Sequence, residues 1–295
     1  MSWQQWIPLF GIAPLLIMLG LLTWQRRRMD ADQRREAITT ELRSLPAASL
    51  QKQRDEFVDR QVTRMVASIL IGLSTVSLFF SRRVSPAAFS WDWLDTVALL
   101  TIIGCGLYYG WLMIRELPHG RKLRHAIRAE QAVAQELAAS LAGDNRIIHD
   151  IQAGDFNIDH VVITPAGVFA VETKSRLKPP VGNGSPKVKY DGKRLEFPGW
   201  TETKPIEQAA RQAKWLADYL QKSTGETFPV FAVLALPGWF IDYSVRVTEQ
   251  MVRVINPKNS GWLLLPGKRP TLLDPPAIQR AAFQIEKLAQ AATPE

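Results

Sequence analysis

The sequence predicts an α/β domain preceded by three transmembrane helices, because its two parts carry different patterns of apolar residues. Three long apolar runs lie before residue 115, at 7–24, 62–80 and 96–114. Beyond residue 115, helical and strand periodicities follow each other in the order helix, three strands, helix, strand. We therefore expect a membrane anchor over 1–114 and a soluble domain over 115–295. Cys105 is the single cysteine, which excludes an intrachain disulfide and a thiolate zinc cluster.

The first apolar run, 7–24, contains no charged residue and would be about 27 Å long as a helix, enough to cross a bilayer. A triplet of arginines, residues 26–28, follows this run instead of preceding it, which is the wrong polarity for a cleaved signal peptide. We therefore expect a retained anchor. The second run is shorter and richer in Ser and Thr, so a buried or re-entrant helix, with two crossings in total, is the alternative there.

The distribution of basic residues predicts the orientation of the anchor. The loop 25–61 holds nine Arg or Lys, the turn before the third run holds only Arg82 and Arg83, and a basic segment follows the third run. Three crossings place both basic regions in the cytoplasm with the N-terminus outside, whereas two crossings place the N-terminus inside. In both cases we expect a multi-pass protein of the inner membrane whose domain 115–295 faces the cytoplasm.

The stretch 157–174 carries the most informative pattern, two apolar strands joined by Pro165-Ala166-Gly167. If the strands pair, Asp159 and Glu172 meet at one end of the sheet with Lys174 beside them. Two adjacent carboxylates bind a hard divalent cation such as Mg²⁺ or Mn²⁺, and an ammonium can orient a water or stabilise negative charge. Solvated surface charge is the plainer interpretation, but carboxylates in such apolar strands are costly to bury without a partner or a metal.

The remaining elements of the domain follow from local signals. Asp191-Gly192 predicts the turn of a small hairpin, and Pro275-Pro276 precedes the last helix. The expected strands are 146–152, 157–164, 168–175, 187–190, 194–197, 230–236, 252–255 and 262–265. The expected helices are 121–141, 204–222 and 277–292.

These motifs together resemble the nuclease-related domain, NERD, of the PD-(D/E)xK restriction-endonuclease-like superfamily, over about 128–237. The resemblance rests on a helix beginning at Ala129-Glu130, on Ile158-Asp159-His160, on Glu172-Thr173-Lys174, and on a later helix that contains Gln208. One departure is Ala129, where the family often has Gly. The resemblance implies an αβββαβ core and metal-dependent hydrolysis of phosphodiester bonds. It further implies metal ligation by Asp159, Glu172 and Glu130, and catalytic roles for Asp159, Glu172, Lys174 and Gln208, with Mg²⁺ or Mn²⁺ as cofactor.

A basic segment follows Lys174 and contains only one acid, Asp191. Such a segment can hold a phosphate backbone without reading base sequence, and a solvated loop is the equally weighted alternative. The predicted nucleic-acid contacts are Arg176, Lys178, Lys187, Lys189, Lys193 and Arg194. We expect the lipid bilayer and DNA or RNA as partners, and a homo-oligomer is compatible with the sequence. The alternative function is a catalytically silent nuclease fold that binds nucleic acid or a partner protein at the inner membrane face.

Overall fold

The computed structural model describes residues 46–81, 92–139, 145–180, 186–246, 248, 250–259 and 271–291, together with positions 17, 20, 21, 23, 24, 27 and 28. The chain divides into two compact units. The first comprises Met1–Asp32 and Lys52–Leu123, and the second comprises Gln33–Gln51 and Arg124–Glu295. Each unit is described by itself.

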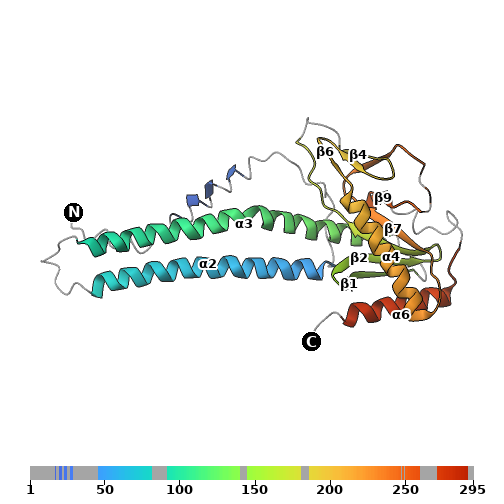
Figure 1. The fold of residues 1–295 in the computed structure, drawn as a ribbon, viewed down its shortest axis with the longest axis horizontal. Helices are drawn as coiled ribbons and strands as arrows, with labels where there is room; N and C mark the ends of the chain where they lie inside the picture. Colours follow the sequence, from blue (N-terminus) through green and yellow to red (C-terminus); the bar gives the residue numbers. More distant parts are fainter. Residues whose placement is uncertain are drawn as a thin grey trace. The chain divides into compact units, whose positions relative to one another are not determined.

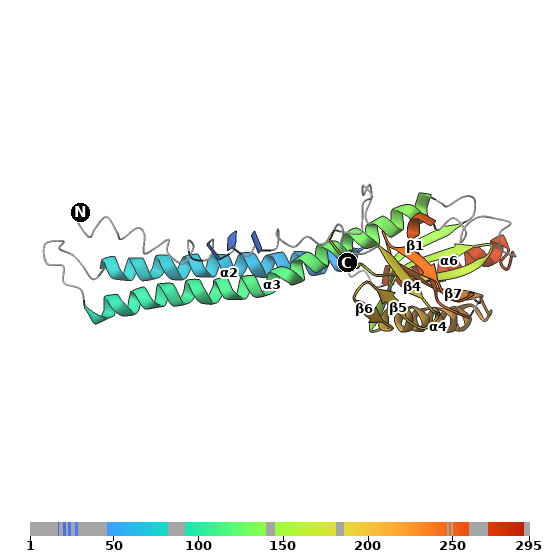
Figure 2. The same cartoon turned by 90° about the horizontal axis from the view of Figure 1, so that it is seen from above.

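Two long helices run side by side, α2 (Ala48–Ser81) and α3 (Trp93–Ala139), as Figures 1 and 2 both show. The first unit contains most of both, whereas residues 48–51 of α2 and 124–139 of α3 belong to the second unit. Polar contacts join the two helices within the first unit. Glu116 on α3 accepts a 2.6 Å hydrogen bond from Gln61 and forms a 2.8 Å ion pair with Arg64, both on α2. Close to these contacts, a Cβ at Gly120 would lie only 2.8 Å from the Phe57 ring, so glycine lets the helices approach.

Within the described residues, one helix is long and apolar enough to cross a membrane, by length and composition alone. This helix is α3, whose candidate window has a mean hydropathy of 1.9 and is only 22% buried. The predicted span 96–114 lies within it. The predicted span 62–80 lies within α2, which does not meet this criterion over the described residues; its side chains from 77 onward fall outside them. The predicted span 7–24 falls mostly outside them.

The second unit contains a five-stranded sheet in the order β1-β2-β3-β7-β9. Strands β1, β2 and β3 form an antiparallel meander, and β7 and β9 extend the sheet in parallel. The strand bounds are β1 Arg146–Ala153, β2 Phe156–Thr164, β3 Gly167–Thr173, β7 Val230–Ala235 and β9 Arg253–Ile255. With α3 before β1 and helix α4 (Lys204–Thr224) before β7, the predicted order of helix, three strands, helix and strand is present.

Helices cover both faces of this sheet because the strands alternate between two apolar sets. On one face, Val161 and Ala170 pack with Leu216 of α4 and with Ile278 of the final helix α6 (Pro275–Ala291). On the other face, the C-terminal turns of α3 supply Val133 and Leu137. These two side chains pack on Val162, Phe169, Val171 and Val233. The sheet is therefore buried on both sides, and its strand ends can position side chains rigidly.

A second, four-stranded sheet has the order β6-β5-β4-β8. Its strands are β4 Lys187–Tyr190, β5 Leu195–Phe197, β6 Trp200–Glu202 and β8 Phe240–Tyr243. The predicted hairpin is confirmed as β4 and β5, whereas β6 and β8 were not expected. The inner face of this sheet forms its own core with α4, built on Val188, Tyr190, Leu195, Phe197 and Trp239.

The turn between β2 and β3 requires glycine at its last position. Thr164 pairs with Gly167, as predicted for the Pro165-Ala166-Gly167 connection. Gly167 has a φ of 128°, and a Cβ there would lie 2.7 Å from the Phe231 ring and 2.9 Å from the Pro229 carbonyl oxygen. Both the backbone conformation and the close neighbours therefore exclude a larger residue.

Candidate active site

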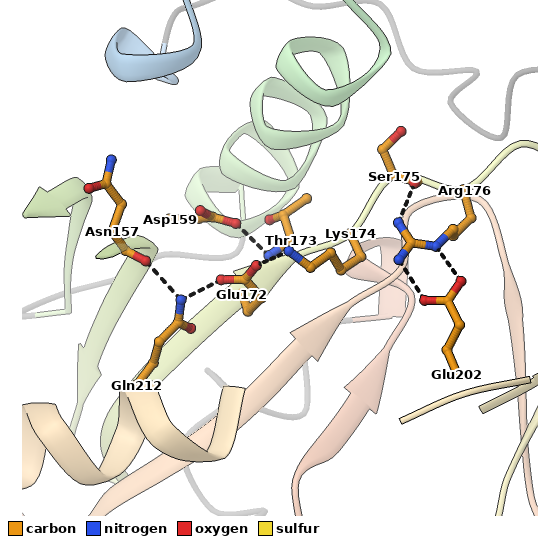
Figure 3. Close-up of polar contacts among 9 residues, drawn as sticks. All are labelled: Asn157, Asp159, Glu172, Thr173, Lys174, Ser175, Arg176, Glu202 and Gln212. Atoms are coloured by element: carbon orange, nitrogen blue, oxygen red, sulfur yellow. Dashed lines mark hydrogen bonds and ion pairs between the residues drawn. The ribbon is translucent and has the colours of Figure 1, made fainter. Parts of the chain in front are cut away.

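Two acids meet where β2 and β3 reach the same end of the sheet. His160 pairs with Val171, so Asp159 and Glu172 occupy the next opposing positions in the antiparallel register. The backbone N–H of Thr173 donates a 2.6 Å hydrogen bond to Asp159 Oδ2, which ties the two strand ends together (Figure 3). The pairing predicted from the sequence is therefore confirmed.

The Glu172 carboxylate is buried, with 2% of the residue exposed, and each of its oxygens has a donor. Lys174 Nζ lies 2.5 Å from Oε1. Gln212 Nε2 donates to Oε2 at 2.5 Å and also to the backbone carbonyl oxygen of Asn157 at 2.8 Å. Figure 3 shows Gln212 reaching from α4 toward the end of the sheet. Two different elements thus hold the orientation of this carboxylate.

The amide in contact with Glu172 belongs to Gln212, and Gln208 lies one turn earlier on α4. Gln208 is half-buried, whereas Gln212 is 1% exposed. Sequence reasoning missed Gln212, although a signal was present. Ile206, Ala209, Ala213, Leu216 and Leu220 form the apolar face of the helix, and Gln212 is a polar side chain at its edge.

A third acid, Glu130 on α3, lies within electrostatic reach of the pair. Burial raises the pKa of Glu130 to about 8, with further contributions from the charges of Asp150 and Glu172, while the charge of Lys174 opposes the shift. Burial also raises the pKa of Asp159 well above its usual value, followed by the charges of Glu172 and Glu130. The structure therefore brings the three predicted acids into one crowded, poorly solvated region that disfavours their ionisation.

Asp150 extends this region along β1 and has an unusual backbone. Its φ is 53°, and its carboxylate accepts hydrogen bonds from the Ser49 N–H at 2.7 Å, the Ser49 hydroxyl at 2.9 Å and Asn157 Nδ2 at 2.8 Å. Asn157 also accepts the bond from Gln212 through its backbone carbonyl. One continuous set of hydrogen bonds therefore joins Ser49 to Glu172.

Two properties of these residues suit a divalent cation: their carboxylate oxygens as ligands, and the repulsion between their charges. Among the residues that the structure describes, no group of three or more His, Cys, Asp or Glu side chains is arranged to hold a metal ion. Both Glu172 oxygens already accept bonds from Lys174 and Gln212. Carboxylate oxygens are nevertheless the donors that Mg²⁺ and Mn²⁺ prefer, and a cation would relieve the mutual repulsion that adds to burial in raising the pKa of Asp159 and of Glu130.

The histidines next to the site pack against each other. His149 Nδ1 lies 2.8 Å from His160 Nδ1, with the rings edge to face, and His160 is fully buried. Burial lowers the pKa of His160 well below its usual value, and the neighbouring His149 lowers it further. His160 is therefore a packed, hydrogen-bonded neutral imidazole.

Acidic side chains pair with several residues of the predicted basic segment, and all of these acids except Asp191 lie outside it. Arg176 forms a two-bonded pair with Glu202 at 2.8 and 2.6 Å. Lys187 pairs with Asp242 at 2.9 Å, and Arg194 pairs with Asp191 at 3.0 Å and with Glu196 at 2.9 Å. Lys178 is half-buried, whereas Lys189 and Lys193 are exposed. The positive charge available to a polyanion is thus smaller than the local sequence indicates.

Comparison with protein families supports the resemblance seen in the sequence. Residues 126–237 match the family described as NERD, the nuclease-related domain. The matched region includes Glu130, Asp159, Glu172, Lys174 and Gln212, and a nuclease-like function is what this match suggests. Neither a search of curated proteins nor a search of solved structures found a match to the chain.

Proposed function

We propose that the nuclease-related region hydrolyses phosphodiester bonds of nucleic acid in a metal-dependent reaction, on a restriction-endonuclease-like core. The observation that carries the proposal is the buried Glu172 carboxylate, held by Lys174 and Gln212 directly opposite Asp159. A buried carboxylate with like-charged neighbours is costly, so such clusters occur mainly where function requires them.

Each residue of the cluster has a distinct part in the proposed reaction. Asp159 and Glu172, with Glu130, would hold Mg²⁺ or Mn²⁺. When bound, the cation supplies Lewis-acid stabilisation of the phosphate charge and lowers the pKa of a bound water. Gln212 fixes the Glu172 carboxylate through one N–H, and its second N–H is anchored on β2 at Asn157. The amide therefore positions the carboxylate and need not contact the substrate.

Lys174 is the residue that would act on the substrate. Its side chain is a quarter exposed, whereas its partner Glu172 is almost fully buried. An ammonium has three N–H donors, and the ion pair with Glu172 leaves donors that can face solvent. These donors can orient an attacking water or stabilise charge that develops on the phosphate.

The proposal includes anchoring to the inner membrane as a multi-pass protein, with the second unit in the cytoplasm. Support comes from the α3 window of mean hydropathy 1.9, most of which is exposed, unlike the core helix of a soluble protein. Basic residues between 115 and 128 follow that window, as expected for a cytoplasmic flank. The crossings at 7–24 and 62–80 are part of this proposal.

The test uses the full-length chain in detergent micelles, with labelled single- and double-stranded DNA and RNA. We expect cleavage with Mg²⁺ or Mn²⁺ and none with EDTA. Glu172→Gln and Lys174→Ala should each lower the rate by about 10²-fold or more, because each removes a group positioned at the reacting phosphate. The matched controls on α4, Glu207→Gln and Lys214→Ala, change exposed charges and should cleave like the parent.

Cleavage at the parental rate by both site variants would refute the assigned site. Binding without cleavage by the parent would instead favour the catalytically silent alternative. One observation supports that alternative, because Lys174 and Gln212 already engage both oxygens of Glu172.

A further inference from the structure

An exposed tryptophan is held rigidly beside the strand end that carries Lys174. Trp200 is 37% exposed and lies on β6 opposite Phe197 of β5, across the Pro198-Gly199 turn. The Trp200 and Phe197 rings are stacked, with centroids 4.7 Å apart and planes only 5° from parallel. Phe197 and Trp239, both buried, support Trp200 from beneath, and Trp239 meets it edge on. Phe197 covers one face of the Trp200 ring, and 37% of the residue remains exposed outside these contacts.

Hydrogen bonds join this aromatic platform, Trp200 with Phe197 and Trp239, to the active-site strand. The Trp200 indole N–H donates to Glu202 Oε1 at 2.7 Å, and Glu202 also holds the guanidinium of Arg176. The Trp239 indole N–H donates to the backbone carbonyl oxygen of Arg176 at 3.2 Å. Arg176 follows Lys174 by two residues, and Figure 3 shows its pair with Glu202 beside Lys174.

The charge balance around Trp200 suits a nucleic acid. Glu202 alone would repel a phosphate, but Arg176 neutralises it through two hydrogen bonds. The Lys174 ammonium lies on the side of the active site, where the phosphate would be held. A flat aromatic surface next to a phosphate-binding cation is the arrangement by which proteins bind single-stranded nucleic acid, with bases stacked on rings and the backbone on cations.

We propose that the exposed face of Trp200 stacks on a nucleobase adjacent to the phosphate held at Glu172 and Lys174, so that the substrate is a single-stranded or locally unpaired nucleic acid. This inference rests on the proposed function. In a duplex, neighbouring bases cover both faces of each base, and a base must leave the stack before an aromatic side chain can replace a neighbour. Trp200 is already fixed in place, so little conformational entropy is lost when a base binds.

The experiment measures binding of the full-length chain in detergent to a labelled oligothymidylate of about 12 nucleotides, in EDTA to prevent cleavage. A set of otherwise identical oligonucleotides carries one abasic position each, which removes a base and keeps the phosphates. We expect one abasic position to weaken binding of the parent by about 5- to 150-fold, the factor for one base–aromatic stack. Trp200→Ala should weaken binding of the intact oligonucleotide by a similar factor and should be insensitive to that abasic position.

Two further variants separate stacking from a structural role. Trp200→Phe keeps an aromatic face and loses the bond to Glu202, so it should retain most of the affinity and the abasic sensitivity. Phe283→Ala removes an aromatic ring that is 64% exposed on α6, away from the platform, and should bind like the parent. Because stacking releases no counterions, Trp200→Ala should leave the salt dependence of binding unchanged.

The outcomes distinguish this inference from the proposed function. If the parent cleaves nucleic acid but Trp200→Ala retains parental affinity and abasic sensitivity, stacking is overturned and the nuclease proposal stands. An abasic effect that persists in Trp200→Ala would overturn it as well. If the parent neither binds nor cleaves DNA or RNA under any condition, both proposals fail together.

Discussion

Replacing Gln212 with leucine separates the stability of the site from its activity, because the two should respond by different amounts. The substitution keeps a similar volume and removes both donors, the one to Glu172 and the one to the Asn157 carbonyl. The bond to a charged group contributes about 1.5–3 kcal/mol and the neutral bond about 0.5–1.5 kcal/mol. On these terms alone the free energy of unfolding would fall by about 2–4.5 kcal/mol.

A second effect opposes this loss. Gln212 Oε1 is buried and has no hydrogen-bond partner among the residues that the structure describes, and such an orphaned acceptor costs about 1–3 kcal/mol. Leucine removes that cost but leaves the buried Glu172 Oε2 without its donor, so the net destabilisation should be about 2 kcal/mol, near the lower end of the range of about 2–4.5 kcal/mol. Activity should fall more steeply, by about 10²-fold or more, which corresponds to about 2.7 kcal/mol, because Glu172 loses the donor that fixes its orientation.

The assay is urea unfolding followed by tryptophan fluorescence, combined with the rate of metal-dependent cleavage, on the full-length chain in detergent. Gln208→Leu is the matched control, since Gln208 lies one turn earlier on the same helix. We expect Gln208→Leu to keep most of the activity. If Gln208→Leu inactivates the protein while Gln212→Leu does not, the reasoning from the Glu172 contact is refuted.

Three other perturbations have expected outcomes. In the metal-free chain, Glu130 has a pKa of about 8 against an ordinary value of 4.5, so the folded state binds more protons across that range. The free energy of unfolding should therefore fall as the pH rises from about 4.5 to about 8. Glu130→Gln should flatten this pH dependence, and a parent whose stability does not change with pH would contradict the burial of Glu130. Gly167→Ala should lower the free energy of unfolding by about 2 kcal/mol or more, because of backbone strain at φ 128° and the clash with Phe231. Gly154→Ala is the control and should cost less, because a Cβ there meets no atom within 4 Å. Leu100 is 62% exposed on α3, and Leu100→Lys should raise the free energy of membrane insertion by about 3 kcal/mol. Less of this variant than of the control Leu100→Phe should remain in the membrane fraction after alkaline extraction. Equal amounts of the two variants would argue against the span.

The elements predicted well from the sequence were those whose signal is local. The hairpin 157–174 has alternating apolar residues on both sides of a Pro-Ala-Gly turn, and β2 and β3 appear there in the expected register. The α4 helix begins and ends close to its expected bounds because a proline lies in its first turn and Gly225 caps it in the left-handed conformation.

The missed features depend on contacts between distant parts of the chain. Strand β8 has four residues and is paired in parallel with β4, with Tyr243 opposite Tyr190, so no local period could reveal it. Glu202 and Asp242 lie outside the basic segment, and only the fold brings them to Arg176 and Lys187. The same limit explains Gln212, whose partner Glu172 lies 40 positions away in the sequence.

The hydrogen bonds that join Ser49 to Glu172 also constrain how this sequence can vary. Each of Asp150, Asn157 and Gln212 has bonds on two sides, so a substitution at one position changes what its neighbours can accept. Free-energy changes along this set should therefore be non-additive. Replacing the Asn157 side chain should interrupt this set of hydrogen bonds at a single point, because it removes the bond to Asp150 and keeps the backbone carbonyl that accepts the bond from Gln212. Among related sequences, loss of Ser49 should accompany replacement of Asp150, whereas Gln212 and Glu172 should change only as a pair.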